Sequence, residues 1–298
     1  MHVKDSIEYP APFDEQADDG IMIANARMYS VTPRVAALWR SLLASVLEAT
    51  GKPVEIVDHA PPAPISELWK RSDKAAVFMC GLPFSLAAPG DSLVVAPVPS
   101  PAAYGGRDCY WSDVVVRADS PFQSIEQTFG HRLALTTPES QSGYAALLHA
   151  LMPFGGSKPL YREIIEPRFT PVGAITAVIE KKAEVAPLDS YAFALLSRHA
   201  PELTSQVRVI RSTEPTAIPA LVASGSASPA IATAFLHAAD IPVVRTLMDQ
   251  LLLAGFTRPG VERYGELRER FLTMRAFWRR HPLAEVAHPL FAAELARS

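Results

Sequence analysis

The feature that most constrains the fold of this chain is the alternation of short apolar runs with helical patterns. Apolar runs occur at 21–25, 54–57 and 75–79, and between the first two the apolar residues of 35–47 recur at helical spacing. A helix between two strands carries the chain back to the same end of a sheet, so that the strands pair in parallel. The sequence therefore predicts an α/β protein whose sheets are mainly parallel and flanked by helices.

Length and charge set the scale of the molecule and exclude some partners. A chain of 298 residues, of which 49% are apolar, can bury sizeable cores and predicts about two domains. The net charge is −3 and no block of Lys or Arg occurs, which argues against a nucleic-acid surface. No run of about 18 apolar residues is present, so we expect no membrane span.

The first residues, 1–20, are polar and acidic and contain no apolar segment of the kind found in signal peptides. Two alternatives stay open: a cytoplasmic protein, or an exported protein whose leader is not part of the sequence. We expect 1–19 to form a loose N-terminal arm.

Motifs for cofactors and catalysis are missing from the sequence. No GxGxxG follows a strand, and neither the P-loop motif nor a GxSxG elbow occurs. The eight histidines are scattered, and Cys80 and Cys109 are too far apart in sequence for a zinc-ligand pair. We therefore expect no nucleotide cofactor, no metal site and no catalytic residues.

Four corners share one pattern, in which polar or aromatic residues follow an apolar strand. They lie at 27–30, 80–84, 140–144 and 189–191. Ligands of open parallel sheets bind outside the carboxyl ends of the strands. We expect the four corners to converge on one cleft between two lobes.

The corner at 140–144 has the strongest rationale for binding an anion. A helix N-terminus exposes unpaired N–H groups and the positive end of the helix dipole. Ser140 and Ser142 add hydroxyl donors, and Gly143 allows close approach to the backbone. The alternative is that these serines only cap the helix, as Asp189 would cap the helix that starts at Ser190.

The order of these motifs resembles the phosphate/phosphite/phosphonate-type substrate-binding proteins of ABC transporters. The similar segments cover roughly 22–270 and read FMCGLPF, YWSDVVVRADSP, PESQSGYAALLHAL, AEVAPLDSYAFALL and VRVIRSTEP. The resemblance implies a two-lobed type II periplasmic-binding-protein fold with two crossover strands. It places lobe one at 20–107 plus 215–298 and lobe two at 108–214.

The resemblance also implies a ligand site and a function. Ser140, Gln141 and Ser142 would hold the head group, and the cleft would further be lined by Tyr29, Gly81, Tyr144, Asp189 and Tyr191. The protein would be the solute-binding component of an ABC-type uptake system, periplasmic by resemblance. It would close on a small anionic or polar ligand and then dock on a membrane permease.

Two departures from the family pattern bear on the ligand. The segment 170–174 lacks the serine and histidine found in phosphonate binders, and Leu82 replaces a tyrosine. Both changes remove polar groups that could contact an oxyanion, which favours a less charged or partly apolar ligand.

The two cysteines leave two alternatives open. They are either two buried free thiols or a disulfide between Cys80 and Cys109. The resemblance raises the second alternative to an equal footing, because the family has its second cysteine just before the corresponding strand.

Two other functions fit the same fold. One is a cytoplasmic enzyme in which Asp189 acts as a general base beside Tyr191 or Tyr29. The other is a ligand sensor that passes closure of the lobes to a partner protein. We expect no enzyme, because the sequence offers no catalytic residues beyond this guess.

Overall fold

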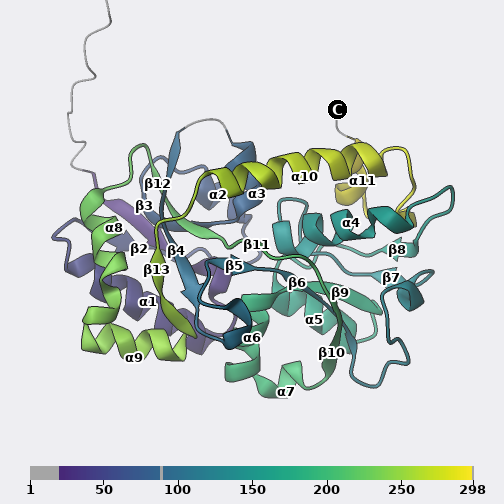
Figure 1. The fold of residues 1–298 in the computed structure, drawn as a ribbon, viewed down its shortest axis with the longest axis horizontal. Coiled ribbons are helices and arrows are strands. Elements are labelled where there is room, and N and C mark those ends of the chain that lie inside the picture. Colours follow the sequence, from purple (N-terminus) through teal and green to yellow (C-terminus); the bar gives the residue numbers. More distant parts are fainter. Residues whose placement is uncertain (1–19, 88–89, 297–298) are drawn as a thin grey trace, which may run out of the picture.

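The computed structural model describes residues 20–87 and 90–296, which form two lobes around two six-stranded sheets (Figure 1). The arm expected at 1–19 lies outside the described residues. The strand order is β13-β4-β12-β3-β1-β2 in the first sheet and β10-β6-β9-β7-β8-β14 in the second. The predicted two-lobed α/β class is confirmed.

Most strands of each sheet share one direction. The strands of the first sheet are β1 (Met22–Asn25), β2 (Val54–Ile56), β3 (Lys74–Met79), β4 (Asp91–Pro99), β12 (Ala220–Ser224) and β13 (Leu253–Thr257). Those of the second are β6 (Ser112–Arg117), β7 (Arg132–Leu133), β8 (Tyr161–Ile164), β9 (Val185–Asp189), β10 (Val207–Ser212) and β14 (Ala284–Ala287). In the first sheet β12 and β13 run against the other strands, and in the second β6 does. Both sheets are therefore mixed, with a majority of strands in one direction.

The chain passes between the lobes at a small two-stranded sheet. β5 (Cys109–Tyr110) leads into β6 of the second sheet, and β11 (Thr216–Ala217) leads back to β12 of the first. The two strands pair antiparallel, with Thr216 opposite Tyr110 and Ala217 opposite Cys109. These are the two crossover strands that the resemblance implied.

Helices cover both sheets. They are α1 (Pro33–Glu48), α2 (Ile65–Trp69), α3 (Gly81–Leu86), α4 (Ala146–Leu151), α5 (Pro171–Ile179), α6 (Ser190–His199), α7 (Pro201–Thr204), α8 (Pro229–Leu236), α9 (Pro242–Gln250), α10 (Glu262–Trp278) and α11 (Pro289–Ala296). None of the helices among the described residues combines the length and apolar character needed to cross a membrane.

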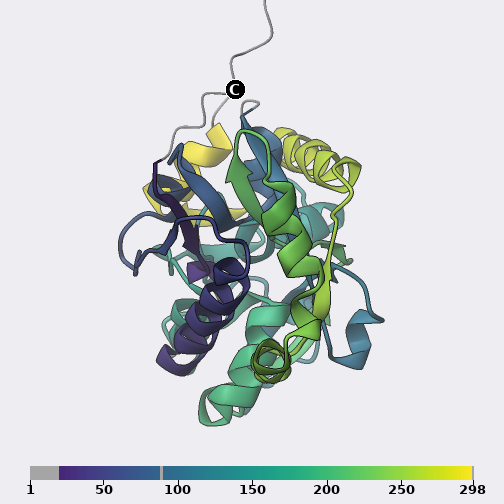
Figure 2. The same cartoon turned by 90° about the vertical axis from the view of Figure 1, so that its left-hand side faces the viewer.

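The core of the first lobe forms where α1, α8 and α9 pack on the sheet, and α1 and α8 lie side by side in Figure 2. α1 begins at Thr32, whose Oγ1 accepts a hydrogen bond from the Val35 N–H, with Pro33 at the first helical position. Its buried residues Trp39, Leu42 and Val46 recur at helical spacing on one face. Burial of each such side chain stabilises the fold by about 1.5–3 kcal/mol.

The C-terminal segment joins both lobes. α10 runs along one side of the molecule from the first lobe to the second (Figure 1). Tyr264 and Leu267 near its start belong to the first core, whereas Phe271 and Trp278 belong to the core of the second lobe. β14 then pairs with β8, and Phe291 of α11 is buried in the second core.

This position corrects the expected boundary of lobe one at its C-terminal end. We expected all of 215–298 there, but β14 and α11 belong to the second lobe. The physical reason is that the apolar stripe of α10 is divided between two cores, so that the chain enters the second lobe before it reaches β14.

α6 also connects the two lobes, in this case from the second lobe into the core of the first. It follows β9 of the second sheet, yet Tyr191 and Leu195 are buried in the core of the first lobe. The Tyr191 hydroxyl donates a hydrogen bond of 2.6 Å to the Leu251 carbonyl beyond α9. The lobes therefore share packed contacts at α6 and at α10 in addition to the crossover strands.

Candidate ligand-binding cleft

A cleft of about 800 Å³ is lined by residues of both lobes. The first lobe contributes the loop after β1, the first half of α1 and the segment from 56 to 69. The second lobe contributes the loop before α4, the start of α5 and the end of β9. Of the predicted ligand-binding residues, Ser140, Ser142 and Asp189 line this cleft. Cys80, one of the two cysteines considered for a disulfide, also lines it.

We call the segment 140–143, together with Thr136, the polar corner. Ser140 caps the helical segment that follows: its Oγ accepts a hydrogen bond of 2.9 Å from the Gly143 N–H. The segment opens with a π-helical turn, Gln141–Ala145, before it continues as α4. Turns of this kind are rare in proteins, and many of those that occur lie at functional sites. The capping interpretation of Ser140 is therefore correct, and the same residue also lines the cleft.

Gly143 and Thr136 are packed closely in the polar corner. The Thr136 N–H donates a hydrogen bond of 3.1 Å to the Gly143 carbonyl, and a Cβ on Gly143 would collide with Thr136 Oγ1. Glycine is therefore the residue that this contact admits. Thr136 is buried, lines the cleft, and its hydroxyl has no hydrogen-bond partner among the described residues.

Asp189 lies beside Ser142 of the polar corner. The Ser142 carbonyl accepts a hydrogen bond of 2.7 Å from the Ser112 hydroxyl, which fixes the turn. One Asp189 carboxylate oxygen caps α6 by accepting from the Tyr191 and Ala192 N–H groups, both at 2.9 Å. Burial raises the pKa of Asp189 to about 7, although these donors and Ser142 act to lower it.

Two other predicted residues lie behind the cleft wall. The Gln141 backbone N–H donates to the Cys80 sulfur at 3.3 Å, and its side chain is buried and does not line the cleft. A Cβ on Gly81 would lie 2.6 Å from Cδ1 of Leu267 on α10, so this glycine permits close packing of α3 against α10. The expectation that Gly81 lines the cleft is wrong for this reason.

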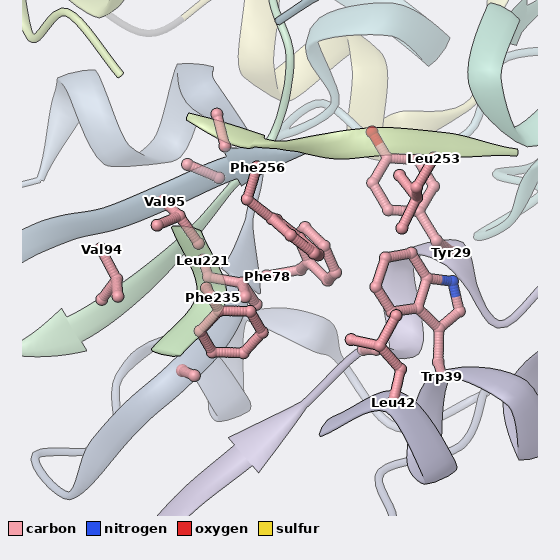
Figure 3. Close-up of a cluster of buried hydrophobic side chains, with 14 of the residues drawn as sticks. Tyr29, Trp39, Leu42, Phe78, Val94, Val95, Leu221, Phe235, Leu253 and Phe256 are labelled. Carbon is pink, nitrogen blue, oxygen red and sulfur yellow. The ribbon is translucent and has the colours of Figure 1, made fainter. Parts of the chain in front are cut away.

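The three predicted tyrosines are core residues rather than cleft residues. Tyr29 packs beside Trp39 and Phe78 in the first core (Figure 3). The centroid of its ring lies 4.8 Å from that of Tyr191. Tyr144 stacks on Phe291 in the second core, with ring centroids 5.7 Å apart. All three tyrosine side chains are fully buried and do not line the cleft, because apolar partners from distant segments surround their rings.

Burial raises the pKa of Tyr29 and of Tyr191 well above that of a free phenol. Neither tyrosine lines the cleft that Asp189 lines, and the Tyr191 hydroxyl is engaged by the Leu251 carbonyl.

Both cysteines are free. Cys80 and Cys109 are buried and unbonded, and the disulfide considered from the resemblance is therefore wrong for this structure. Cys80 Sγ accepts from the Gln141 N–H, whereas Cys109 lies on the crossover strand β5 with its thiol near the Tyr104 carbonyl. The two sulfur atoms therefore lie in different surroundings, each near its own backbone group. The described residues contain no group of three or more metal-ligating side chains.

Arg27 is a cleft residue whose role the sequence did not indicate. Its guanidinium lines the cleft and donates a hydrogen bond of 2.6 Å from Nη1 to the Ala63 carbonyl. No carboxylate among the described residues forms an ion pair with it, and partial burial lowers its pKa. The signal was present, since Arg27 opens the corner at 27–30, where the resemblance implies only Tyr29 as a ligand contact.

An apolar surface faces the cleft at the start of α5. We call the segment 169–173 the apolar corner. Thr170 caps α5 by accepting a hydrogen bond of 3.0 Å from the Gly173 N–H. Phe169, before the cap, has a φ of 57° and a ring that is 54% exposed, and Pro171 and Val172 follow it along the cleft. From the first lobe, the partly exposed apolar residues Met28, Val31 and Ile65 line the same cleft.

The comparisons with known proteins agree with this architecture. A family model described as the periplasmic substrate-binding protein of ABC phosphonate transporters matches residues 30–264. No curated protein matches the chain. Proteins of the matched family bind a solute for an ABC transporter and its permease and are not enzymes, which confirms the predicted class of function.

Solved structures share the fold at low sequence identity. A binding protein component of an ABC phosphonate transporter from Pseudomonas aeruginosa superposes with a TM-score of 0.73 at 15% identity, covering 92% of this chain and 93% of the other. PhnD1 from Prochlorococcus marinus, in complex with methylphosphonate, gives 0.71 at 14% identity, with coverage of 86% and 99%. A Xanthomonas citri protein bound to ATP gives 0.60 at 18% identity, with coverage of 86% and 98%.

The family match spans most of the chain, and the structural neighbours carry the two-lobed type II fold over nearly their whole length. The chain belongs to the family of periplasmic substrate-binding proteins of ABC phosphonate transporters.

Proposed function

We propose that the cleft captures a phosphonate- or phosphate-like oxyanion with its head group at the polar corner. The observation that carries this proposal is the buried hydroxyl of Thr136, which lines the cleft and has no partner among the described residues. A buried hydroxyl without a partner costs about 1–3 kcal/mol, and an oxyanion at this position would accept its hydrogen bond.

Further donors surround the same position. The Ser140 hydroxyl accepts from Gly143 and keeps its own proton to donate, and the Ser142 side chain lines the cleft beside it. The helical segment from 141 to 151 directs the positive end of its dipole toward this point. These donors match the three oxygens of a phosphonyl group, each of which accepts strong hydrogen bonds.

Arg27 supplies positive charge from the opposite lobe. A ligand held by the polar corner and by Arg27 would contact both lobes at once, so it would bind the closed form more tightly than the open form. That difference in affinity shifts the population toward closure, which is the state that an ABC permease would recognise. The methylphosphonate held by the Prochlorococcus marinus neighbour supports this class of ligand.

Isothermal titration calorimetry on the purified protein tests the proposal with methylphosphonate, inorganic phosphate and sulfate. Thr136→Val removes the hydroxyl at constant shape and is expected to weaken the bound oxyanion by about 1–3 kcal/mol, as is Ser142→Ala. Thr233→Val on the exposed face of α8 is the matched control and should leave affinity unchanged. If both cleft variants keep full affinity and only lose thermal stability, these hydroxyls serve the fold alone.

The family is periplasmic, and we propose that this protein also works there. Fractionation of cells that express the native gene would place the product in the periplasm. Recovery in the cytoplasm alone would contradict this location without affecting the ligand proposal.

A further inference from the structure

Phe169 is unusual in both its backbone and its surroundings. A bulky residue rarely adopts a positive φ, and here φ is 57°. More than half of the side chain is exposed, and it lines the cleft at the start of α5. Strained residues of this kind concentrate at ligand contacts, because the surrounding structure must maintain them against their cost.

The first lobe also lines the cleft with apolar side chains. Met28, Val31 and Ile65 of the first lobe are partly exposed and line the cleft that Phe169 and Val172 line from the second. This part of the cleft therefore offers apolar side chains from both lobes, in contrast with the hydroxyl groups of the polar corner.

The size of the cleft exceeds the needs of a small head group. Methylphosphonate consists of a phosphonyl group and one methyl group. A cleft of about 800 Å³ lies in the range of sites for drug-sized ligands. A phosphonyl group at the polar corner would leave most of the apolar wall uncovered.

We infer that the ligand joins its oxyanion head group to an apolar body, and that Phe169 closes over this body against Met28, Val31 and Ile65. The inference rests on the proposed function, because it assumes the head group at the polar corner. The exposed Phe169 ring would become buried when the lobes close on the ligand. The affinity gained from the apolar body would then depend on this ring.

Calorimetry with methyl-, butyl- and phenylphosphonate tests the inference. We expect each buried methylene to tighten binding by about two- to fourfold, so that butyl- and phenylphosphonate bind at least tenfold more tightly than methylphosphonate. Phe169→Asn removes the ring but keeps a residue that tolerates positive φ, so the fold is retained. We expect it to weaken phenylphosphonate about tenfold and to leave methylphosphonate unchanged.

Two further variants control for side effects. Phe169→Leu keeps an apolar side chain and should retain most of the preference for the larger ligands. Leu272→Asn makes the same kind of change on an exposed part of α10 outside the cleft and should alter neither affinity.

The outcomes separate the two proposals. If methylphosphonate binds as tightly as the larger ligands, the apolar body is wrong and the proposed function stands. If the larger ligands bind more tightly but Phe169→Asn has no effect, the role of Phe169 is wrong. If none of the three phosphonates nor inorganic phosphate binds, the proposed function fails, and the inference fails with it.

Discussion

Two helical segments of the second lobe begin at the same cleft. Both begin with the same kind of hydroxyl cap, but polar side chains surround one cap and apolar side chains surround the other. At α4 the Ser140 hydroxyl accepts from the Gly143 N–H at 2.9 Å, and at α5 the Thr170 hydroxyl accepts from the Gly173 N–H at 3.0 Å. In both, a hydroxyl residue caps the helix and a glycine follows three residues later.

The residues around the two caps determine what each start can bind. The polar corner adds the hydroxyls of Ser142 and Thr136, whereas the apolar corner adds Phe169 and Val172. A capped helix start is therefore no evidence for an anion site by itself. The neighbouring side chains decide whether it meets a charged group or an apolar one.

The largest effect that we expect concerns Asp189, beside the polar corner. Burial holds its pKa at about 7, whereas the carboxyl of an unfolded chain has a pKa near 3.8. Between these pH values the unfolded chain releases a proton that the native protein keeps, so the free energy of unfolding falls as pH rises. The stabilisation is fully present below about pH 4 and is lost by about pH 7, by up to about 4 kcal/mol.

Urea unfolding of the wild type and of Asp189→Asn across this pH range measures the effect. Asparagine also caps a helix, so that the fold is kept while the titrating group is removed. Burial raises the pKa of Asp113 as well, but Asp113 is present in both proteins and its contribution largely cancels in the difference. Parallel pH profiles for the two proteins would show that Asp189 is solvated and that this end of the corner is open.

The second effect compares the two glycines. An added methyl group would collide with Thr136 Oγ1 at Gly143 and with the Arg168 carbonyl at Gly173. Gly143→Ala and Gly173→Ala should each lower the free energy of unfolding by about 1–3 kcal/mol. Only Gly143→Ala should also weaken methylphosphonate, because only that collision displaces a proposed ligand donor.

Gly265→Ala is the control for these two variants. No atom lies within 4 Å of a Cβ at this position in α10, so the change should raise stability by about 0.5–1 kcal/mol. Equal losses of methylphosphonate affinity in Gly143→Ala and Gly173→Ala would remove the functional distinction between the corners.

The smallest effect concerns the strain at Phe169. Phe169→Gly relieves the positive φ and should raise the free energy of unfolding by about 0.5–1 kcal/mol. Lys181→Gly, at a φ of 60° on the exposed surface, should give a similar gain. Thermal or urea unfolding measures both. A gain at Lys181 with a loss at Phe169 would mean that the ring stabilises the protein without a ligand.

The sequence predicted the parts of this structure that depend on local interactions. Thr32 and Asp189 cap the helices that follow them, because a cap is made between residues a few positions apart. Most strands of the two large sheets were also recognisable, since each is a short apolar run between turn residues, whereas the crossover strands were expected only from the resemblance. The corner at 140–143 could be identified because its hydroxyls and glycine stand at a strand-to-helix junction.

The directions of side chains at the other corners could not be predicted. Tyr29 and Tyr191 occupy junctions of the same type, but their rings enter the first core because Trp39, Phe78 and Leu251 lie there. These partners are distant in sequence. The pairing of β14 with β8 could not be predicted for the same reason. Nor could the position of Phe169 in the cleft, because the cleft forms only when the two lobes are assembled.

The crossing of α10 into the second lobe has a consequence for synthesis. The core of that lobe includes Leu82 and Val114 early in the sequence and Trp278 and Phe291 late in it. Domains generally fold as units while the chain emerges from the ribosome. Here the second lobe lacks part of its interior until the final helix has been made. Its apolar sheet face therefore stays uncovered through most of translation, and a chain stopped before α10 would present that face to chaperones and proteases.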